Sequence, residues 1–203
     1  MSRMTTPRQL FVHELQDVYY AEQTLTRVLP TLASQATDRE LTRAFESHAR
    51  ETQKQVTNLE KVFKSIGERA EGQPCPGIDG IKREHDEFMR EHDATPVVAD
   101  VFLTGSAARA EHYEIAAYTS LIEKARALGE RDSVKLLQAN LRQEKDALKK
   151  VETISKRILK STNGSSPRSR SSSSSRGRST SARSTARRST AKRSSSTRTR
   201  SRS

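Results

Sequence analysis

Apolar side chains recur at alternating steps of four and three residues through most of residues 8–160, and this spacing constrains the fold more than any other feature. On an α-helix it gathers these side chains into one stripe, which becomes buried by packing against other helices. The chain has no Trp and few aromatic residues, so its core would rest on aliphatic side chains, which suit helices better than a β-sandwich. Pro30 interrupts the first segment and predicts a kink or a shortened last turn. That segment carries its stripe at Phe11, Leu15, Val18, Glu22, Leu25, Leu29 and Leu32.

A second helix is predicted to begin near Asp38 and to end at Gly67, since a glycine commonly follows the last turn of a helix. Either Thr37 or Asp38 could cap it, and Glu40 follows Thr37 by three residues, as in a capping box. Its stripe would consist of Leu41, Phe45, His48, Thr52, Gln55, Leu59, Val62 and Ile66.

The remaining helical region contains one short helix and two long ones. A loop rich in Gly and Pro precedes a short polar helix over 78–93. A third long helix would run from Pro96 to about Gly129. A fourth would begin near Asp132, with its stripe at Val134, Leu137, Leu141, Glu144, Leu148 and Val151.

Four long amphipathic helices, with a long connection between the second and the third, are typical of ferritin-like proteins. We therefore predict an all-α fold. It would be an antiparallel four-helix bundle of the ferritin-like kind over 8–160, and its long crossover would contain the short helix.

The composition changes abruptly at Ser161. Residues 161–203 contain no Leu, Ile, Val, Met or aromatic residue, too little apolar surface to offset the entropy lost on ordering, so we predict a disordered tail. Of the 37 Lys and Arg residues, twelve lie in this tail, which has no Asp or Glu; the other 25 balance all 25 Asp and Glu residues of 1–160. The basic character of the chain therefore belongs to the tail and says little about the helical domain.

Cys75 is the only cysteine, which excludes an internal disulfide and fits a reducing compartment. We interpret it as an incidental loop thiol. The first residues lack the apolar core of a secretion signal, and no run approaches the roughly 18 apolar residues of a transmembrane helix. We therefore expect a cytoplasmic protein without a transmembrane segment, associated with the nucleoid if its tail binds DNA.

Each long helix interrupts its apolar stripe with side chains that can bind a metal. Placing an ionised carboxylate in an apolar core costs several kcal/mol unless a partner compensates. A pair of divalent cations compensates well, and carboxylate oxygens with an imidazole nitrogen suit iron or manganese. The sequence therefore predicts two Fe or Mn ions between the helices. The candidate ligands are Glu22 in the first helix, His48 and Glu51 in the second, Glu111 and Glu114 in the third, and Glu144 in the fourth.

Taken one at a time, these residues have structural explanations as well. Glu22 could reach solvent at the edge of its stripe or join an ion pair, and His48 could be a hydrogen-bonded core histidine. Glu111 and Glu114 could straddle the edge of a wide face, and Glu144 could pair with a lysine. Their coincidence on four helices favours the metal site.

Several stretches of the chain also resemble a known family. They are "ELQDVYYAEQTLTRVLPTLA" (14–33), "HARETQKQVTNLEKVF" (48–63), "AEHYEIAAY" (110–118) and the "QEK" after the leucines of the fourth helix. Over about 10–158 the chain resembles the YciE/YciF-like family, ferritin-like bacterial proteins labelled as a domain of unknown function. The resemblance implies a four-helix bundle, a di-metal centre and, for some members, dimers and an association with stress responses, so we expect a homodimer. It implies no settled reaction.

The resemblance also implies roles for the six candidate ligands, although the chain departs from the two Glu-x-x-His pairs of the wider superfamily. The second helix reads His-x-x-Glu, and Ala147 rather than a histidine follows Glu144 by three residues. His112 neighbours Glu111 but lies about 100° further round the helix. Three tyrosines could donate hydrogen bonds to the ligands, act as radical relays, or pack in the core: Tyr19, Tyr113 and Tyr118. The di-iron carboxylate pattern makes Glu22 and one of Glu111 or Glu114 terminal or bridging ligands, with His48 and Glu51 from the second helix and Glu144 from the fourth.

Twelve positive charges on a flexible segment are an electrostatic footprint for polyanions such as nucleic acid. Each neutralised phosphate releases counterions, so binding would be independent of sequence and would weaken steeply with salt. The tail has no aromatic residue for base stacking, which argues against specific single-strand recognition. A solubility tail and a membrane-surface contact are the alternatives. The residues expected to contact nucleic acid are Arg168, Arg170, Arg176, Arg178, Arg183, Arg187, Arg188, Lys192, Arg193, Arg198, Arg200 and Arg202.

The sequence supports two functional hypotheses, which can both hold. In the first, a stress-associated ferritin-like protein uses a di-metal carboxylate site for metal oxidation or peroxide consumption, and its tail binds nucleic acid non-specifically. In the second, a non-enzymatic helical module oligomerises and coats nucleic acid with its tails, and its polar core is structural. The sequence does not decide whether the chain is an enzyme.

Overall fold

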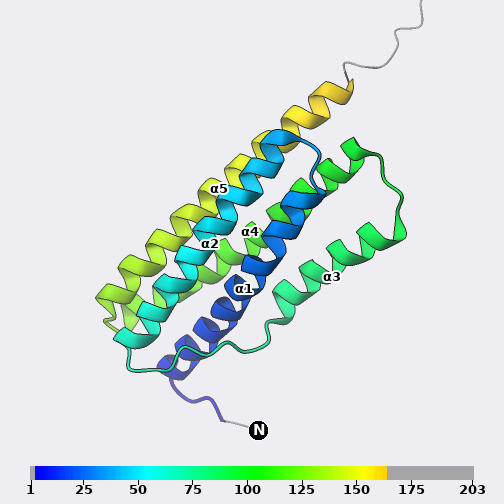
Figure 1. The fold of residues 1–203 in the computed structure, drawn as a ribbon. Helices are drawn as coiled ribbons and strands as arrows, with labels where there is room; N and C mark the ends of the chain where they lie inside the picture. Colours follow the sequence, from blue (N-terminus) through cyan, green and yellow to red (C-terminus); the bar gives the residue numbers. More distant parts are fainter. Residues whose placement is uncertain (1–2, 164–203) are drawn as a thin grey trace, which may run out of the picture. The chain divides into compact units, whose positions relative to one another are not determined.

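The computed structural model describes residues 3–163, which form five α-helices and no β-strand within that range. Four long helices make the bundle: α1 (Pro7–Gln35), α2 (Arg39–Ser65), α4 (Pro96–Ala127) and α5 (Arg131–Asn163). The shorter α3 (Pro76–Glu91) lies within the connection between α2 and α4. The predicted all-α ferritin-like bundle, with a short helix in its long crossover, is confirmed (Figure 1).

The crossover makes neighbouring helices of the bundle antiparallel. α1 packs against α2 and α4, and α5 packs against the same two helices from the other side. α3 travels along the outside of the bundle, so α4 starts at the end where α2 also starts (Figure 1). It packs on α4 and is joined to α1 by the hydroxyl of Tyr20, which donates a hydrogen bond to Asp79 at 3.1 Å. Residues at the middle of all four long helices therefore share one layer.

Helix termini follow the sequence closely. Gly67 and Gly129 adopt positive φ angles of 73° and 79°, a conformation that glycine reaches without the penalty of a side chain. They close α2 and α4 as predicted. α1 continues through Pro30 to Gln35, so this proline does not shorten the helix. α5 continues to Asn163, three residues past the expected boundary of the domain.

The start of α2 differs in one detail from the expected capping. Asp38 is the N-cap, and its Oδ1 accepts hydrogen bonds from the amides of Glu40 (3.1 Å) and Leu41 (3.0 Å). Thr37 does not form the capping box with Glu40. Its hydroxyl and amide both donate to the buried carboxylate of Asp100 in α4, at 2.6 and 2.8 Å. The turn between α1 and α2 is thereby tied to a helix far away in sequence.

The core consists of two apolar clusters separated by a polar layer. Along every long helix, residues of one cluster precede the polar positions and residues of the other follow them. One cluster includes Leu25, Leu29, Phe45, Leu103 and Ile154, and the other includes Phe11, Leu15, Phe63, Leu121 and Leu137. The layer between them contains the predicted ligands.

No helix in the described residues 3–163 is both long enough and apolar enough to cross a lipid bilayer. The twelve basic residues of the predicted tail, Arg168 to Arg202, lie outside the described residues.

Candidate metal centre

Five of the six predicted ligands meet in the buried layer between the two apolar clusters. Counted over the whole residue, their exposed fractions run from 0% to 6%, and each of the four long helices contributes at least one of them. They are Glu22 from α1, His48 from α2, Glu111 and Glu114 from α4, and Glu144 from α5. The sixth, Glu51, lies outside this layer with 38% of its side chain exposed. His112, the neighbour of Glu111, is also exposed.

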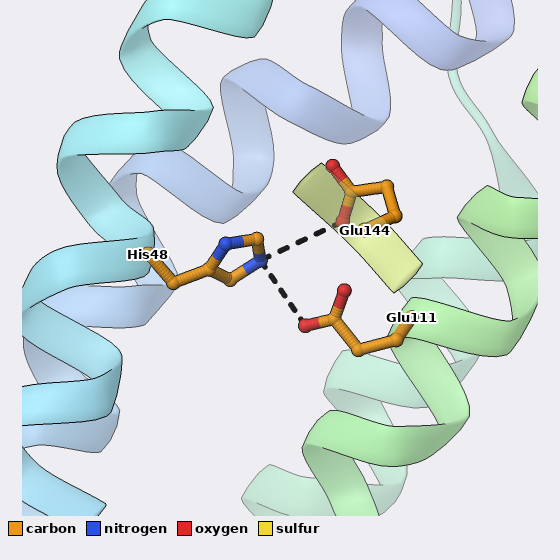
Figure 2. A group of neighbouring side chains, drawn as sticks. All are labelled: His48, Glu111 and Glu144. Atoms are coloured by element: carbon orange, nitrogen blue, oxygen red, sulfur yellow. Dashed lines mark ion pairs between the residues drawn. The ribbon is translucent and has the colours of Figure 1, made fainter. Parts of the chain in front are cut away.

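Three of these residues form a compact triad. Nε2 of His48 lies 3.1 Å from Oε1 of Glu111 and 3.7 Å from Oε2 of Glu144. One ligand atom from each residue lies within 4.8 Å of the other two. Figure 2 shows the imidazole edge of His48 pointing between the two carboxylates, which come from different helices. Donors at this separation can reach a common cation at ordinary coordination distances.

The buried carboxylates offer more acceptor oxygens than the protein satisfies. Among residues 3–163, Oε2 of Glu22, Oε2 of Glu111, Oε2 of Glu144 and both oxygens of Glu114 have no hydrogen-bond partner. A buried carboxylate oxygen without a partner is costly, and native proteins rarely retain several of them in one place. Divalent cations would supply the missing partners, so the residues present fit a metal centre.

Two of these carboxylates each accept a hydrogen bond at one oxygen. The hydroxyl of Tyr118 donates to Oε1 of Glu22, and the side-chain amide of Gln55 donates to Oε1 of Glu144. Asn140 donates to the hydroxyl of Tyr118 at 3.0 Å and to the main-chain carbonyl of Gln55 at 3.2 Å, so one side chain supports both donors. Partners of this kind orient metal ligands and fix which oxygen faces the ion.

The other two tyrosines singled out in the sequence point elsewhere. The hydroxyl of Tyr19 donates to Glu60 at 3.2 Å, and the hydroxyl of Tyr113 lies 2.9 Å from Sγ of Cys75. Sequence reasoning also missed Asn140 as a supporting residue. Its only signal was its position one helical turn before Glu144, which places it on the same face of the helix.

Burial of this many charges shifts the proton affinities of the layer. Burial raises the pKa of Glu22 to about 8, against the opposing effect of the Tyr118 hydrogen bond. Burial and then the neighbouring carboxylates raise the pKa of Glu114 and of Glu144 well above the usual range. Burial lowers the pKa of His48, but the carboxylates of Glu111, Glu51 and Glu144 outweigh it, and the net shift is strongly upward. Without a cation the layer therefore retains protons, and metal binding would release them.

A pocket of about 130 Å³ connects the triad to the surface between α2, α4 and α5. His48 and Glu111 lie at its inner end. Glu51 is at the rim, with Oε2 at 3.7 Å from Nδ1 of His48, beside Asp146 and Lys150. The structure thus places Glu51 next to the triad but on the solvent side of the imidazole.

Comparison with known proteins gives one family. Residues 6–163 match DUF892, a domain of unknown function. Protein YciF of Escherichia coli strain K12 is 35% identical to this chain over 143 residues, which cover 70% of this chain and 86% of that protein.

Three solved structures have a similar fold. YcfI from Rhodopseudomonas palustris is 44% identical and covers 75% of this chain and 98% of its own, with a TM-score of 0.73. The Escherichia coli stress protein YciF is 33% identical and covers 77% of this chain and 99% of its own, with a TM-score of 0.74. A protein from Xanthomonas campestris pv. campestris is 22% identical, covers 78% of this chain and 97% of its own, and has a TM-score of 0.60; it supports the fold alone.

Proposed function

This chain belongs to the DUF892 family of domains of unknown function, and from that premise we propose that it is a stress-associated protein that binds two iron or manganese ions in its buried carboxylate layer. The association with stress rests on its similarity to YciF, which is described as a stress protein. The family expected from the sequence is confirmed by these matches.

The observation that carries the proposal is the excess of unsatisfied oxygens around a single imidazole. Five buried carboxylate oxygens in residues 3–163 have no hydrogen-bond partner, and they come from glutamates on α1, α4 and α5. Two of them belong to Glu111 and Glu144, the carboxylates of the His48 triad. A structural polar core would instead pair its oxygens with donors, as Asp100 does with Thr37. Oxygens left open toward a common centre are what a cation site requires.

We assign the ligands from this pattern. His48, Glu111 and Glu144 would hold one ion. Glu22 and Glu114 would contribute the oxygens for a second ion, with Glu111 or Glu144 shared between the two. Glu51 is not needed in this assignment, because its side chain lies at the surface.

When bound, iron or manganese would supply redox chemistry toward O2 or peroxide at coordination positions that the protein leaves open. The chain itself contributes the surroundings. Its two apolar clusters exclude bulk water from both sides of the layer. Tyr118 and Gln55 hold one oxygen of Glu22 and of Glu144 in place. We propose metal oxidation or peroxide consumption as the activity.

Metal analysis of untagged protein tests the proposal. Protein incubated anaerobically with Fe(II) or with Mn(II) and then desalted should retain about two ions per chain. Glu144→Ala should reduce the bound metal, whereas Glu123→Gln, an exposed glutamate on α4, should leave it unchanged. Aeration of the Fe(II) form, or addition of peroxide, then shows whether the bound metal turns over. Absence of bound metal in the unmodified protein would refute the proposal.

A second candidate function comes from the sequence of the tail. Twelve Lys or Arg residues and no Asp or Glu in 161–203 favour non-specific binding of DNA, RNA or another polyanion. In that function the helical domain, which we propose to be a homodimer, would present the tails. A gel shift that disappears when residues 164–203 are removed, and that persists in a Glu22→Ala/Glu114→Ala variant, would support it. Equal DNA binding by the truncated protein would refute it.

A further inference from the structure

We propose that the pocket between α2, α4 and α5 is the port through which divalent cations reach the buried layer, and that Glu51 binds the cation at the rim and passes it to His48. The proposal rests on the metal-binding function proposed above and adds a route to it. It also explains why a carboxylate lies beside the triad but outside the buried layer.

The geometry of the pocket joins solvent to the ligands. Its inner end is formed by His48 and Glu111, two members of the triad, whose side chains are 8% and 4% exposed. Nδ1 of His48 has no hydrogen-bond partner within residues 3–163, although it lies 3.7 Å from Oε2 of Glu51. Glu51 itself is 38% exposed, so its carboxylate contacts both water and the imidazole edge. A hydrated cation can therefore find a first protein oxygen before it leaves solvent.

Charged side chains at the rim of the pocket should change the rate at which cations enter. Asp146 adds a second carboxylate to that of Glu51, and Lys150 lies one helical turn from Asp146 at the same rim. Lys150 competes with an incoming cation for these carboxylates, so its charge should slow entry.

Within residues 3–163 the layer is bounded differently on its other sides. Apolar clusters cover it above and below along the bundle axis. A larger pocket of about 240 Å³ lies between α1 and α4, but its lining includes Tyr113 and Ala117 and none of the five buried ligands. This second pocket supplies a matched control, because a residue there can be enlarged in the same way as one in the port.

Stopped-flow uptake of Co(II), followed by the absorbance of the bound ion, tests the port. Ala147 lines the pocket and is 8% exposed, so Ala147→Met should fill the pocket while every proposed ligand is kept. We expect uptake to slow by about tenfold or more, since a packed interior admits solutes only through transient openings. The amount of Co(II) bound at equilibrium should stay the same. Ala117→Met, in the control pocket, should leave the rate unchanged.

The charged residues give a second set of variants that does not depend on packing. Glu51→Gln should slow uptake about threefold and Lys150→Gln should speed it by a similar factor, because fixed charges near a site change association rates of ions. Glu46→Gln, an exposed glutamate on the opposite face of α2, controls for net charge.

The outcomes separate this proposal from the metal-binding function. If the unmodified protein binds Co(II) and neither Ala147→Met nor Glu51→Gln changes the rate, the port is refuted and the metal site stands. If Glu51→Gln instead lowers the amount bound at equilibrium, Glu51 is a ligand and its role in passage is refuted. If the unmodified protein binds neither Co(II) nor Mn(II), both proposals fail.

Discussion

Tyr118 donates a hydrogen bond to Oε1 of Glu22 in the interior of the bundle, where both side chains are fully buried. The opposite oxygen of Glu22 has no partner among the described residues. Glu144 repeats this arrangement, with Gln55 bound to one oxygen and the other left open. Two carboxylates from different helices are thus each held by one neutral donor, and each has its other oxygen buried and unpaired.

Removing the first of these donors should weaken metal binding without unfolding the protein. Tyr118→Phe keeps the ring but removes the hydrogen bonds to Glu22 and Asn140. We expect the affinity for Mn(II) to fall by about tenfold, the usual effect of losing a partner of a metal ligand. Competition with a chelator measures the affinity. Tyr19→Phe, whose hydroxyl binds Glu60, should have no effect on it; equal losses in the two variants would contradict the assigned role of Tyr118.

The metal-free protein should become less stable as the pH rises. The folded protein binds a proton at Glu22 up to a pKa of about 8, whereas the unfolded chain releases it near 4.5. Between these values the native state holds more protons, so the free energy of unfolding falls with increasing pH. The raised pKa values of Glu114, Glu144 and His48 act in the same direction.

The size of this effect is measurable. The shift of Glu22 alone corresponds to at most about 5 kcal/mol between pH 4.5 and 8. Guanidinium unfolding of chelator-treated protein at pH 5, 6.5 and 8 gives the slope, and Glu22→Gln should flatten it. Added Mn(II) should restore stability at pH 8, because the cation replaces the lost protons. A metal-free protein whose stability rises over this interval would contradict these proton affinities.

Helical spacing was enough to predict the fold and the buried layer, because both depend on which face of each helix a residue occupies. Glu22, His48 and Glu144 each take a place in the apolar stripe of their helix, so the sequence alone indicated that they are buried. Glu51 shows the limit of that reasoning. Its position one turn from His48 puts it on nearly the same face, and only the packing of α5 against α2 shows that it lies at the surface.

Neighbouring residues in the sequence were also insufficient to predict contacts that depend on a distant residue. Thr37 and Asp38 are equally good caps for α2 by sequence. Asp100, 63 residues beyond Thr37, binds the threonine and leaves the cap to Asp38. For Asn140 the sequence showed only a position one turn before Glu144, and its role depends on partners on α2 and α4.

Breaking the contact of Asp100 should lower stability but not metal binding. Its carboxylate accepts hydrogen bonds from the hydroxyl and amide of Thr37 and from the amide of Asp38. Asp100→Ala would remove all three hydrogen bonds to this buried carboxylate, so we expect a loss of about 2–3 kcal/mol in the free energy of unfolding. Asp132→Ala, at a side chain that is 80% exposed, should change it little. Loss of bound metal in Asp100→Ala protein that remains folded would contradict the separation of these two roles.

Replacing the proposed ligand Glu114 by an apolar side chain should stabilise the metal-free protein and abolish binding of the second proposed ion. Glu114 is 1% exposed, and neither of its oxygens has a hydrogen-bond partner in the described part of the chain. Methionine has a similar length and removes the cost of burying the carboxyl group, so Glu114→Met should gain about 1–4 kcal/mol at pH 8 without metal. The same variant should no longer be stabilised by Mn(II). Thermal unfolding with and without the ion measures both effects. A structural role for Glu114 predicts the reverse. Glu114→Met would then be destabilised in the absence of metal, because the variant would lose the stabilising contacts of the carboxyl group.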